Sequence, residues 1–279
     1  IFECNKSADT VKELIENRIL EPFLPQFKLF FDDPSHYFHK DGLLGHSYHS
    51  LRSLEDIIGN LKKILPKYSR KIYNYLNSKV DGSVKRLVIL KFSTLLHDIG
   101  KPETAKIIND RLRFFGHEVR GVKITTDILL KLKASKKEIR VARKLILYHM
   151  RPSNLFEQKP ITERAIFRFF RDIGNETIML LLLSLADRFS YQVVKRQDKV
   201  LKKHLLMTRK MINKYFSSKS KAEIKPILDG YKIMKHFNLN PSPLIGKLKN
   251  LLLEAQIEGK VKNEEEAYKF LEEKLNEGV

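Results

Sequence analysis

The chain has 279 residues, and its 53 Lys and Arg against 33 Asp and Glu give a formal net charge of +20 at pH 7. Hydrophobic residues make up 42% of the sequence, which is enough for a substantial core and excludes a wholly disordered chain. The one cysteine, Cys4, excludes a disulfide framework and is typical of a reducing cytoplasm, where we expect the protein to act.

The cationic excess indicates a polyanionic partner. Nucleic acid is the expected one, because cations that neutralise its phosphates release counterions. The alternative is a solvated surface rich in Lys and Glu that has no such partner. No signal peptide is expected, since no basic segment followed by an apolar one opens the sequence. No apolar stretch is long enough to cross a bilayer, which predicts no membrane association, and the sequence does not indicate an oligomeric state.

Helical periodicity dominates the chain and predicts an all-α fold. In chain order, the expected helices cover residues 9–20, 44–65, 84–96, 118–132, 136–149, 162–173, 175–192 and 198–216, with a smaller helical unit from residue 226 to the C-terminus. Residues 32–42 are expected to form a loop. Residues 105–114 fit either a small hairpin or an extended loop, with Asn109 and Asp110 at the turn.

The dipeptide His97-Asp98 ends the apolar predicted helix 84–96. Neighbouring side chains within a helix point about 100° apart, but at a helix end an imidazole and a carboxylate can both turn toward one cation. A buried carboxylate needs a partner, and a metal ion is an efficient one. Gly100 then allows a sharp turn, and Lys101 places a cation at the mouth of this predicted site.

Asp187 lies near the end of a predicted helix that is apolar nearly all round and should therefore be central in the fold. An acid in that position is either a charge paired with Arg188 or a metal ligand. The sequence around it leaves both interpretations open.

Several histidines are further candidates. His46 and His49 are three residues apart and share roughly one helix face, His117 precedes a predicted helix, and His149 ends one. Each of them alone is typical of a hydrogen-bonded core or surface histidine. Taken together with the acids, they indicate a mixed nitrogen and oxygen site for a divalent ion.

The order His, His-Asp, Asp resembles the HD superfamily of metal-dependent phosphohydrolases, and Leu-Leu-His-Asp-Ile-Gly-Lys-Pro at 95–102 is the most specific part of the resemblance. It implies an HD-domain helical bundle around a divalent ion, with the metal ligands His49, His97, Asp98 and Asp187. His49 rather than His46 is matched to the family's first ligand, because Ser50, Leu51 and Leu54 follow it on the expected face. His117 and His149 match the extra histidines of members that bind a second metal or use them on substrate.

Residues 14–26 and the C-terminal segments 226–230, 240–247 and 254–261 resemble the HD and tail region of bacterial CCA-adding enzymes and poly(A) polymerases. The nucleotidyltransferase head of that family has no counterpart in this sequence, so the chain is not expected to be a nucleotidyltransferase on its own. It is expected to be either the C-terminal part of such an enzyme or a stand-alone relative. The predicted division is an N-terminal helical connector at 1–42, an HD metal-binding domain at 43–195, and a basic helix with a smaller C-terminal helical subdomain at 196–279.

The resemblance implies an HD-type phosphohydrolase that acts on phosphate esters of nucleotides or RNA ends, including 2′,3′-cyclic phosphates. Asp98 is expected to orient the attacking water or accept its proton, with Lys101 as the accompanying catalytic cation. Arg120 and Arg188 are expected to bind phosphate oxygens, unless they form ordinary surface ion pairs. Nickel, manganese and magnesium all remain candidates for the metal, and the histidines favour a transition metal.

The second hypothesis is an RNA-binding body without catalysis of its own. Cations alternate with apolar residues around the predicted helix 198–216, so the apolar side chains can pack inward while the cations face a tRNA or another structured RNA. The expected contacts are Lys195, Arg196, Lys199, Lys202, Lys203, Arg209, Lys210 and Lys214. The alternative is a solvated helix whose Lys stems cover apolar surface. A purely structural metal is a third hypothesis, which the two extra histidines disfavour because a closed structural site needs only four ligands.

Overall fold

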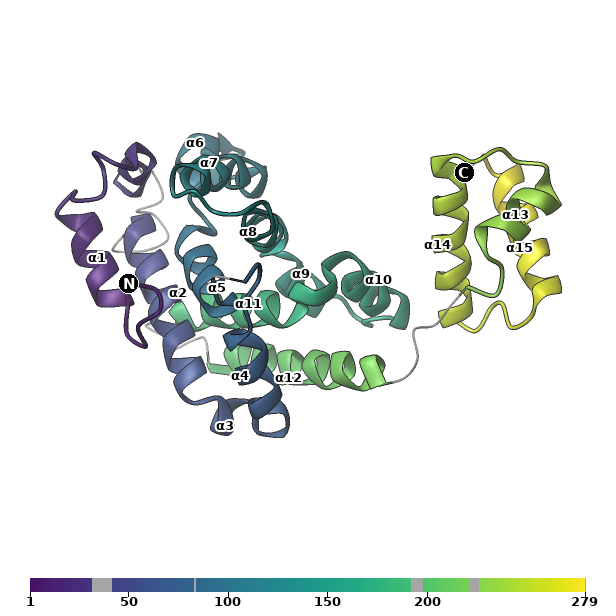
Figure 1. Ribbon diagram of the computed structural model, residues 1–279, viewed down its shortest axis with the longest axis horizontal. Helices are drawn as coiled ribbons and strands as arrows, with labels where there is room; N and C mark the ends of the chain where they lie inside the picture. The colour runs from purple at the N-terminus through teal and green to yellow at the C-terminus, as the bar shows by residue number, and fades with distance from the viewer. Residues whose placement is uncertain (32–41, 83, 192–197, 221–225, 279) are drawn as a thin grey trace. The chain divides into compact units, whose positions relative to one another are not determined.

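The structure is a computed structural model that describes residues 1–31, 42–82, 84–191, 198–220 and 226–278 (Figure 1). The chain forms two compact units, the first made of Ile1–Glu157 and Ile173–Asn213 and the second of Gln158–Asp172 and Lys214–Val279. This division differs from the expected one. The predicted N-terminal connector groups with the first unit, and the later boundary falls inside α12 (Asp198–Ser220) rather than after residue 195.

The first unit is a bundle of helices. Besides α12 and short 3-10 turns, its helices and strands are α1 (Ala8–Glu16), α2 (Gly42–Gly59), α3 (Leu61–Ile64), α4 (Ser69–Asn77), α5 (Arg86–Leu96), α6 (Lys101–Thr104), β1 (Lys106–Ile108), β2 (Arg111–Arg113), α7 (His117–Lys131), α8 (Lys136–Tyr148), α9 (Arg151–Glu157) and α11 (Thr177–Ser190). Among the described residues the only strands are β1 and β2, which pair antiparallel. The predicted all-α class is confirmed.

Helix α11 is the centre of the first unit. Its residues 177–186 are all buried, because leucines occupy every side of the helix and each side needs apolar cover. Helix α2 packs along it, and α5, α8 and α9 contact it as well (Figure 1). This packing brings the ends of α5 and α8 beside the C-terminal part of α11.

Helix α1 is capped by a residue distant in sequence. Ser7 occupies its N-cap position, but the Glu55 carboxylate of α2 accepts hydrogen bonds from the Ser7 N–H and the Ser7 hydroxyl, both at 2.7 Å. Lys91 Nζ of α5 lies 2.7 Å from Glu55 Oε1 and 2.6 Å from the Cys4 carbonyl oxygen. A buried ion pair therefore ties the N-terminal segment to α2 and α5.

Several elements of the first unit differ from the prediction, and the short helices α6 and α9 were not expected. The expected helix 44–65 is divided at Asn60 into α2 and α3. Helix α4 was not predicted; it is nine residues long and buries only Ile72 and Leu76. None of the described helices is both long and apolar enough to span a membrane.

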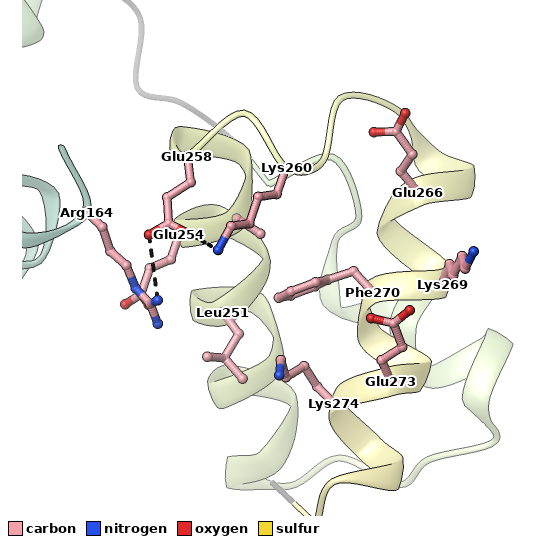
Figure 2. A pocket seen from close by; sticks show the side chains of 11 residues that line it. Arg164, Leu251, Glu254, Glu258, Lys260, Glu266, Lys269, Phe270, Glu273 and Lys274 are labelled. Carbon is pink, nitrogen blue, oxygen red and sulfur yellow. Dashed lines mark hydrogen bonds and ion pairs between the residues drawn. The ribbon is translucent and has the colours of Figure 1, made fainter. Parts of the chain in front are cut away.

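The second unit contains α10 (Glu163–Ile173, of which the last residue groups with the first unit), α13 (Gly230–Phe237), α14 (Pro243–Ile257) and α15 (Glu264–Asn276). Helices α13 to α15 have their own apolar core, which includes Leu228, Ile233, Leu248 and Leu271. A groove lies against α14 and α15, and Figure 2 shows the charged side chains that line it. Several of its cations pair with acids, as in the Lys260–Glu258 pair at 2.8 Å.

Candidate metal centre

Six side chains from the ends or bodies of five helices of the first unit gather in one cluster, in which all but the partly buried Asp187 are buried. They are His46 in α2, His97 and Asp98 at the end of α5, His117 at the start of α7, His149 at the end of α8 and Asp187 in α11. We call His46, His97 and Asp187 the first trio, and Asp98, His117 and His149 the second trio. Within each trio, the potential ligand atoms lie within 4.8 Å of one another.

The first trio has the spacing of ligands around one ion. His46 Nε2 lies 3.2 Å from His97 Nε2 and 3.2 Å from Asp187 Oδ1, and His97 Nε2 lies 3.6 Å from Asp187 Oδ1. Nitrogen and oxygen ligands at about 2.0–2.2 Å from a shared ion are separated by roughly 3–3.6 Å. The three donors are thus pre-arranged for a single cation.

Asp98 joins the two trios. Its Oδ1 lies 3.4 Å from His117 Nε2 and 3.6 Å from His149 Nε2, which are themselves 3.2 Å apart. Its Oδ2 lies 3.2 Å from His46 Nε2 and 3.4 Å from His97 Nε2. One carboxylate that faces two donor sets is the arrangement of a site for two neighbouring ions.

The four imidazoles of the cluster are held in the tautomer that a metal ligand needs. Three of them place Nδ1 within 2.8 Å of a backbone carbonyl oxygen, in the pairs His97–Thr94, His117–Phe114 and His149–Ile146. A carbonyl oxygen only accepts, so each Nδ1 donates and each Nε2 presents a lone pair to the cluster.

His46 is oriented through a hydroxyl instead of a carbonyl. Its Nδ1 lies 3.2 Å from Ser190 Oγ, and that hydroxyl donates to the Asp187 carbonyl oxygen at 2.6 Å. The hydroxyl proton is therefore committed to the carbonyl, and the Ser190 oxygen accepts from His46 Nδ1. This contact leaves His46 Nε2 as the inward ligand atom.

The charges inside the cluster outweigh the effect of burial on its pKa values. Burial lowers the pKa of His46, but the Asp187 and Asp98 carboxylates beside it raise that pKa to about 9. Burial raises the pKa of Asp98, but Lys101 and the imidazoles hold it well below its usual range. The pKa of Asp187 is held down in the same way by His46 and His97. Both acids therefore stay ionised.

The donor set fits a divalent cation. Asp187 Oδ1 is buried and makes no directed hydrogen bond within the described part of the chain, although His46 Nε2 lies 3.2 Å away. Two ionised carboxylates in this space need compensating positive charge, which a bound divalent cation supplies in place of a proton on His46. Mixed imidazole and carboxylate ligation suits transition metals better than a purely oxygen-ligated ion such as magnesium.

The structure places His46 in the cluster and leaves His49 outside it, whereas the sequence predicted His49 as the first ligand. The two residues are three apart on α2, and their side chains point about 60° apart around the helix. His46 is 2% exposed and faces α5 and α11. His49 is partly exposed, and its ring lies against Tyr48 with 5.0 Å between centroids.

The three predicted cations near the cluster have different surroundings. Lys101 Nζ lies 2.5 Å from Asp98 Oδ2, at the edge of both trios. Arg120 forms an ion pair with Glu103, which occupies its guanidinium. Arg188 follows Asp187 directly, and its Nε is buried without a hydrogen-bond partner among the described residues.

The predicted RNA-binding cations lie on or just before α12. Lys195 and Arg196 lie outside the described residues. Lys199, Lys202, Lys203 and Lys210 are exposed on the helix, opposite buried residues such as Met211. The other two have structural partners: Arg209 Nε donates to the Ile64 carbonyl oxygen at 2.8 Å, and Lys214 pairs with Glu163.

Two residues beside the cluster were not among the predicted site residues. Ser190 orients His46, as described above. The Tyr191 ring lies 5.3 Å from that of His46, and burial together with the nearby carboxylates of Asp187 and Asp98 raises its pKa. Both residues follow Asp187 by about one helical turn, a spacing that could have indicated them.

Comparison with known families agrees with this geometry. The HD domain family matches residues 47–192, more than half of the chain. The chain belongs to the HD domain family. The matched range of the HD domain contains five members of the cluster, and it begins one residue after His46. The place of His46 in the cluster therefore rests on the distances alone.

The chain is also similar to three tRNA nucleotidyltransferases. It is 29% identical to the A-adding tRNA nucleotidyltransferase of Deinococcus radiodurans over 66% of this chain and 41% of that protein. It is 29% identical to the CC-adding tRNA nucleotidyltransferase of Thermus thermophilus over 65% of this chain and 39% of that protein. The CC-adding enzyme of a Synechocystis species is 29% identical over 54% of this chain and 33% of that protein. The match thus spans about two fifths of the first two relatives.

Proposed function

We propose that this HD domain is a metal-dependent phosphohydrolase whose substrates are phosphate esters of nucleotides or RNA ends, including 2′,3′-cyclic phosphates. The observation that carries the proposal is the pair of donor trios joined by Asp98, with the Lys101 ammonium 2.5 Å from the same carboxylate. The first trio would hold one ion and the second trio another. Bound divalent ions would supply an activated water and would offset the charge that develops on the phosphoryl group.

The residues around the trios have distinct tasks in this proposal. Asp98 stays ionised and faces both trios, so it can fix the position of a water and accept its proton. Lys101 provides a fixed cation for a phosphate oxygen at the edge of the site. Arg188, whose Nε has no described partner, would provide a second one.

The substrate class is supported by charge and by similarity. The net charge of +20 favours polyanions, and the relatives are named as enzymes that add nucleotides to tRNA. A tRNA or another structured RNA would then be the molecule whose end reaches the cluster. The exposed lysines of α12 would bind its backbone.

The test of this proposal compares His46→Ala with His49→Ala, a matched pair on the same helix. The purified protein is assayed with 2′,3′-cyclic nucleotides and with p-nitrophenyl phosphate after addition of Ni²⁺, Mn²⁺ or Mg²⁺. We expect His46→Ala and His97→Ala to lose at least about 100-fold in kcat/KM, because each removes a ligand. His49→Ala should retain nearly full activity. The absence of turnover with every metal would contradict the proposal.

A second candidate function is RNA binding without hydrolysis, favoured by the exposed Lys199, Lys202, Lys203 and Lys210. A salt titration of tRNA binding tests it. Replacing these four lysines with glutamine should weaken binding and flatten the dependence of log Kd on log salt, because each lost phosphate contact releases fewer counterions. Absence of binding at low salt would exclude this function and leave the hydrolase unaffected.

A further inference from the structure

The hairpin of β1 and β2 is a short, tightly turned ribbon on the first unit. Its turn residues Asn109 and Asp110 have φ values of 50° and 55°, both in the left-handed region. Two such residues in succession give the turn whose twist matches paired strands, and Asn and Asp tolerate this conformation well. The sequence left open a hairpin or an extended loop at 105–114, and the strand pairing confirms the hairpin.

One face of this hairpin carries only cations and an apolar residue. Lys106 lies opposite Arg113, and Ile108 lies opposite Arg111. Because side chains alternate along a strand, these four share one face, which we call the ribbon face. Like charges directly opposite each other destabilise a hairpin, so the Lys106–Arg113 pair does not contribute to the stability of this one.

The ribbon face is open and its cations are unpaired. Lys106, Arg111 and Arg113 are exposed and form no ion pair within the described ranges of the chain. Phe115, which follows β2, is 74% exposed. A shallow hollow is lined by Ile108, Asn109, Arg111, Arg113 and Phe115. Two guanidinium groups beside an exposed aromatic ring form a surface that suits a phosphate backbone with a stacked base.

The ribbon face leads directly to the second trio. The chain passes from Arg113 to His117 in four residues, which span at most about 14 Å. The Phe114 carbonyl oxygen accepts from His117 Nδ1 at 2.8 Å, and Lys101 Nζ lies 5.6 Å from the centre of the Phe114 ring. A strand bound on the ribbon face could therefore place its end at Asp98 and Lys101.

We propose that the ribbon face binds the single-stranded oligonucleotide segment next to the phosphoester that the cluster acts on. In this arrangement Arg111, Arg113 and Lys106 contact backbone phosphates, and Phe115 stacks on a base. The proposal rests on the proposed hydrolase function and narrows its substrate class from nucleotides or RNA ends to the ends of single-stranded RNA.

Binding is tested without hydrolysis, on the whole chain in EDTA. The anisotropy of a fluorescent single-stranded RNA of about ten nucleotides with a 3′-phosphate is followed as protein is added. Arg111→Gln/Arg113→Gln should weaken binding at least about tenfold and lower the slope of log Kd against log salt by about 1.4, the value for two lost contacts to a single strand. Phe115→Ala should weaken binding at least about fivefold.

The matched control is Lys62→Gln/Lys63→Gln, which removes two exposed charges from α3. It should change Kd by less than about twofold, because it alters net charge without touching the ribbon face. All these side chains are exposed, so the melting temperature of each variant should equal that of the parent. Oligonucleotide binding that is equal in the parent and in the ribbon-face variants would overturn the proposal.

A small substrate separates this proposal from the proposed function. Metal-dependent hydrolysis of bis(p-nitrophenyl) phosphate should be the same in the ribbon-face variants and the parent, whereas kcat/KM for the RNA 3′-end should fall with its binding. An equal fall for both substrates would overturn the ribbon-face proposal and leave the hydrolase standing. Weakened RNA binding in a protein with no hydrolysis of either substrate would overturn the hydrolase and support nucleic-acid binding at the ribbon face.

Discussion

The Nε2 atom of His46 shares its surroundings with one other imidazole and two carboxylates. In the absence of a bound cation, a proton on His46 is the charge that compensates these acids, which is why its pKa rises to about 9. A metal ligand must be deprotonated, so a metal ion and this proton compete for the same nitrogen.

Metal binding is therefore expected to release a proton from His46. Below pH 9 the apparent affinity should rise with pH, by up to about tenfold per unit for one displaced proton, and level off above about 9. Titration calorimetry with Mn²⁺ in buffers of different ionisation enthalpy measures the released protons. His49→Ala should behave as the parent, and an affinity independent of pH between 6.5 and 9 would contradict the expectation.

The raised pKa of His46 also makes the folding stability of the metal-free protein depend on pH. A group with a folded pKa above its unfolded value of 6.5 stabilises the fold fully below that pH. Its contribution is lost as the pH rises through about 9. The metal-free protein should therefore lose stability between these pH values, and bound metal should reduce the loss. Chemical denaturation at several pH values with and without Mn²⁺ measures this, and a metal-free stability that increases with pH across this window would be inconsistent with it.

Gly100 is needed for space rather than for its backbone conformation. Its φ is −82°, which other residues adopt readily, but a Cβ at this position would lie 2.2 Å from the His117 carbonyl oxygen and 2.6 Å from the Gly121 nitrogen. Gly100→Ala should displace the start of α7 and lower the free energy of unfolding by about 1–3 kcal/mol. It should also weaken the affinity of the second trio for metal. Gly59→Ala is the control, because nothing lies within 4 Å of its added methyl group. Equal melting temperatures and metal affinities of the two variants would refute this account.

At the scale of elements, apolar periodicity and helix-end signals were enough to predict most helices of the first unit. They were also enough to single out His97, Asp98 and Asp187, because an acid or imidazole at the end of an apolar helix is conspicuous in sequence. They could not choose between His46 and His49, since the two lie on overlapping faces of one helix. Which of the two turns inward depends on how α2 packs against α11, a contact between segments far apart in the chain.

The capping of α1 by Glu55 could not be predicted from sequence patterns either, because Ser7 and Glu55 are 48 residues apart. Lys91 and Glu55 side chains are only 2% and 5% exposed. Lys91→Met should therefore lower the free energy of unfolding by about 3–5 kcal/mol, since it leaves a buried carboxylate without its cation. Denaturant unfolding measures the change. Lys137→Ala, which breaks the more exposed Lys137–Asp81 pair, is the control and should cost less than about 1 kcal/mol. A Lys91→Met cost as small as the control's would contradict the capping account.

At the scale of the whole molecule, all six members of the cluster belong to the first unit, and the second unit has its own apolar core. Metal binding should therefore stabilise one unit and leave the other unchanged. At a metal concentration of about 100 times Kd, binding should raise the free energy of unfolding of the first unit by about 2.7 kcal/mol. For a unit of this size, that gain corresponds to a rise in melting temperature of roughly 5–10 °C. Scanning calorimetry should show one transition that moves with Mn²⁺ and one that does not. A common shift of all transitions would contradict this independence.

The central claim is that the two trios hold two ions joined by Asp98. Anomalous diffraction from crystals of the protein grown with Mn²⁺ tests it most directly. The account predicts two anomalous peaks on either side of the Asp98 carboxylate, one against His46, His97 and Asp187 and one against His117 and His149. An ion bound through His49, or no peak within this cluster at a saturating Mn²⁺ concentration, would contradict it.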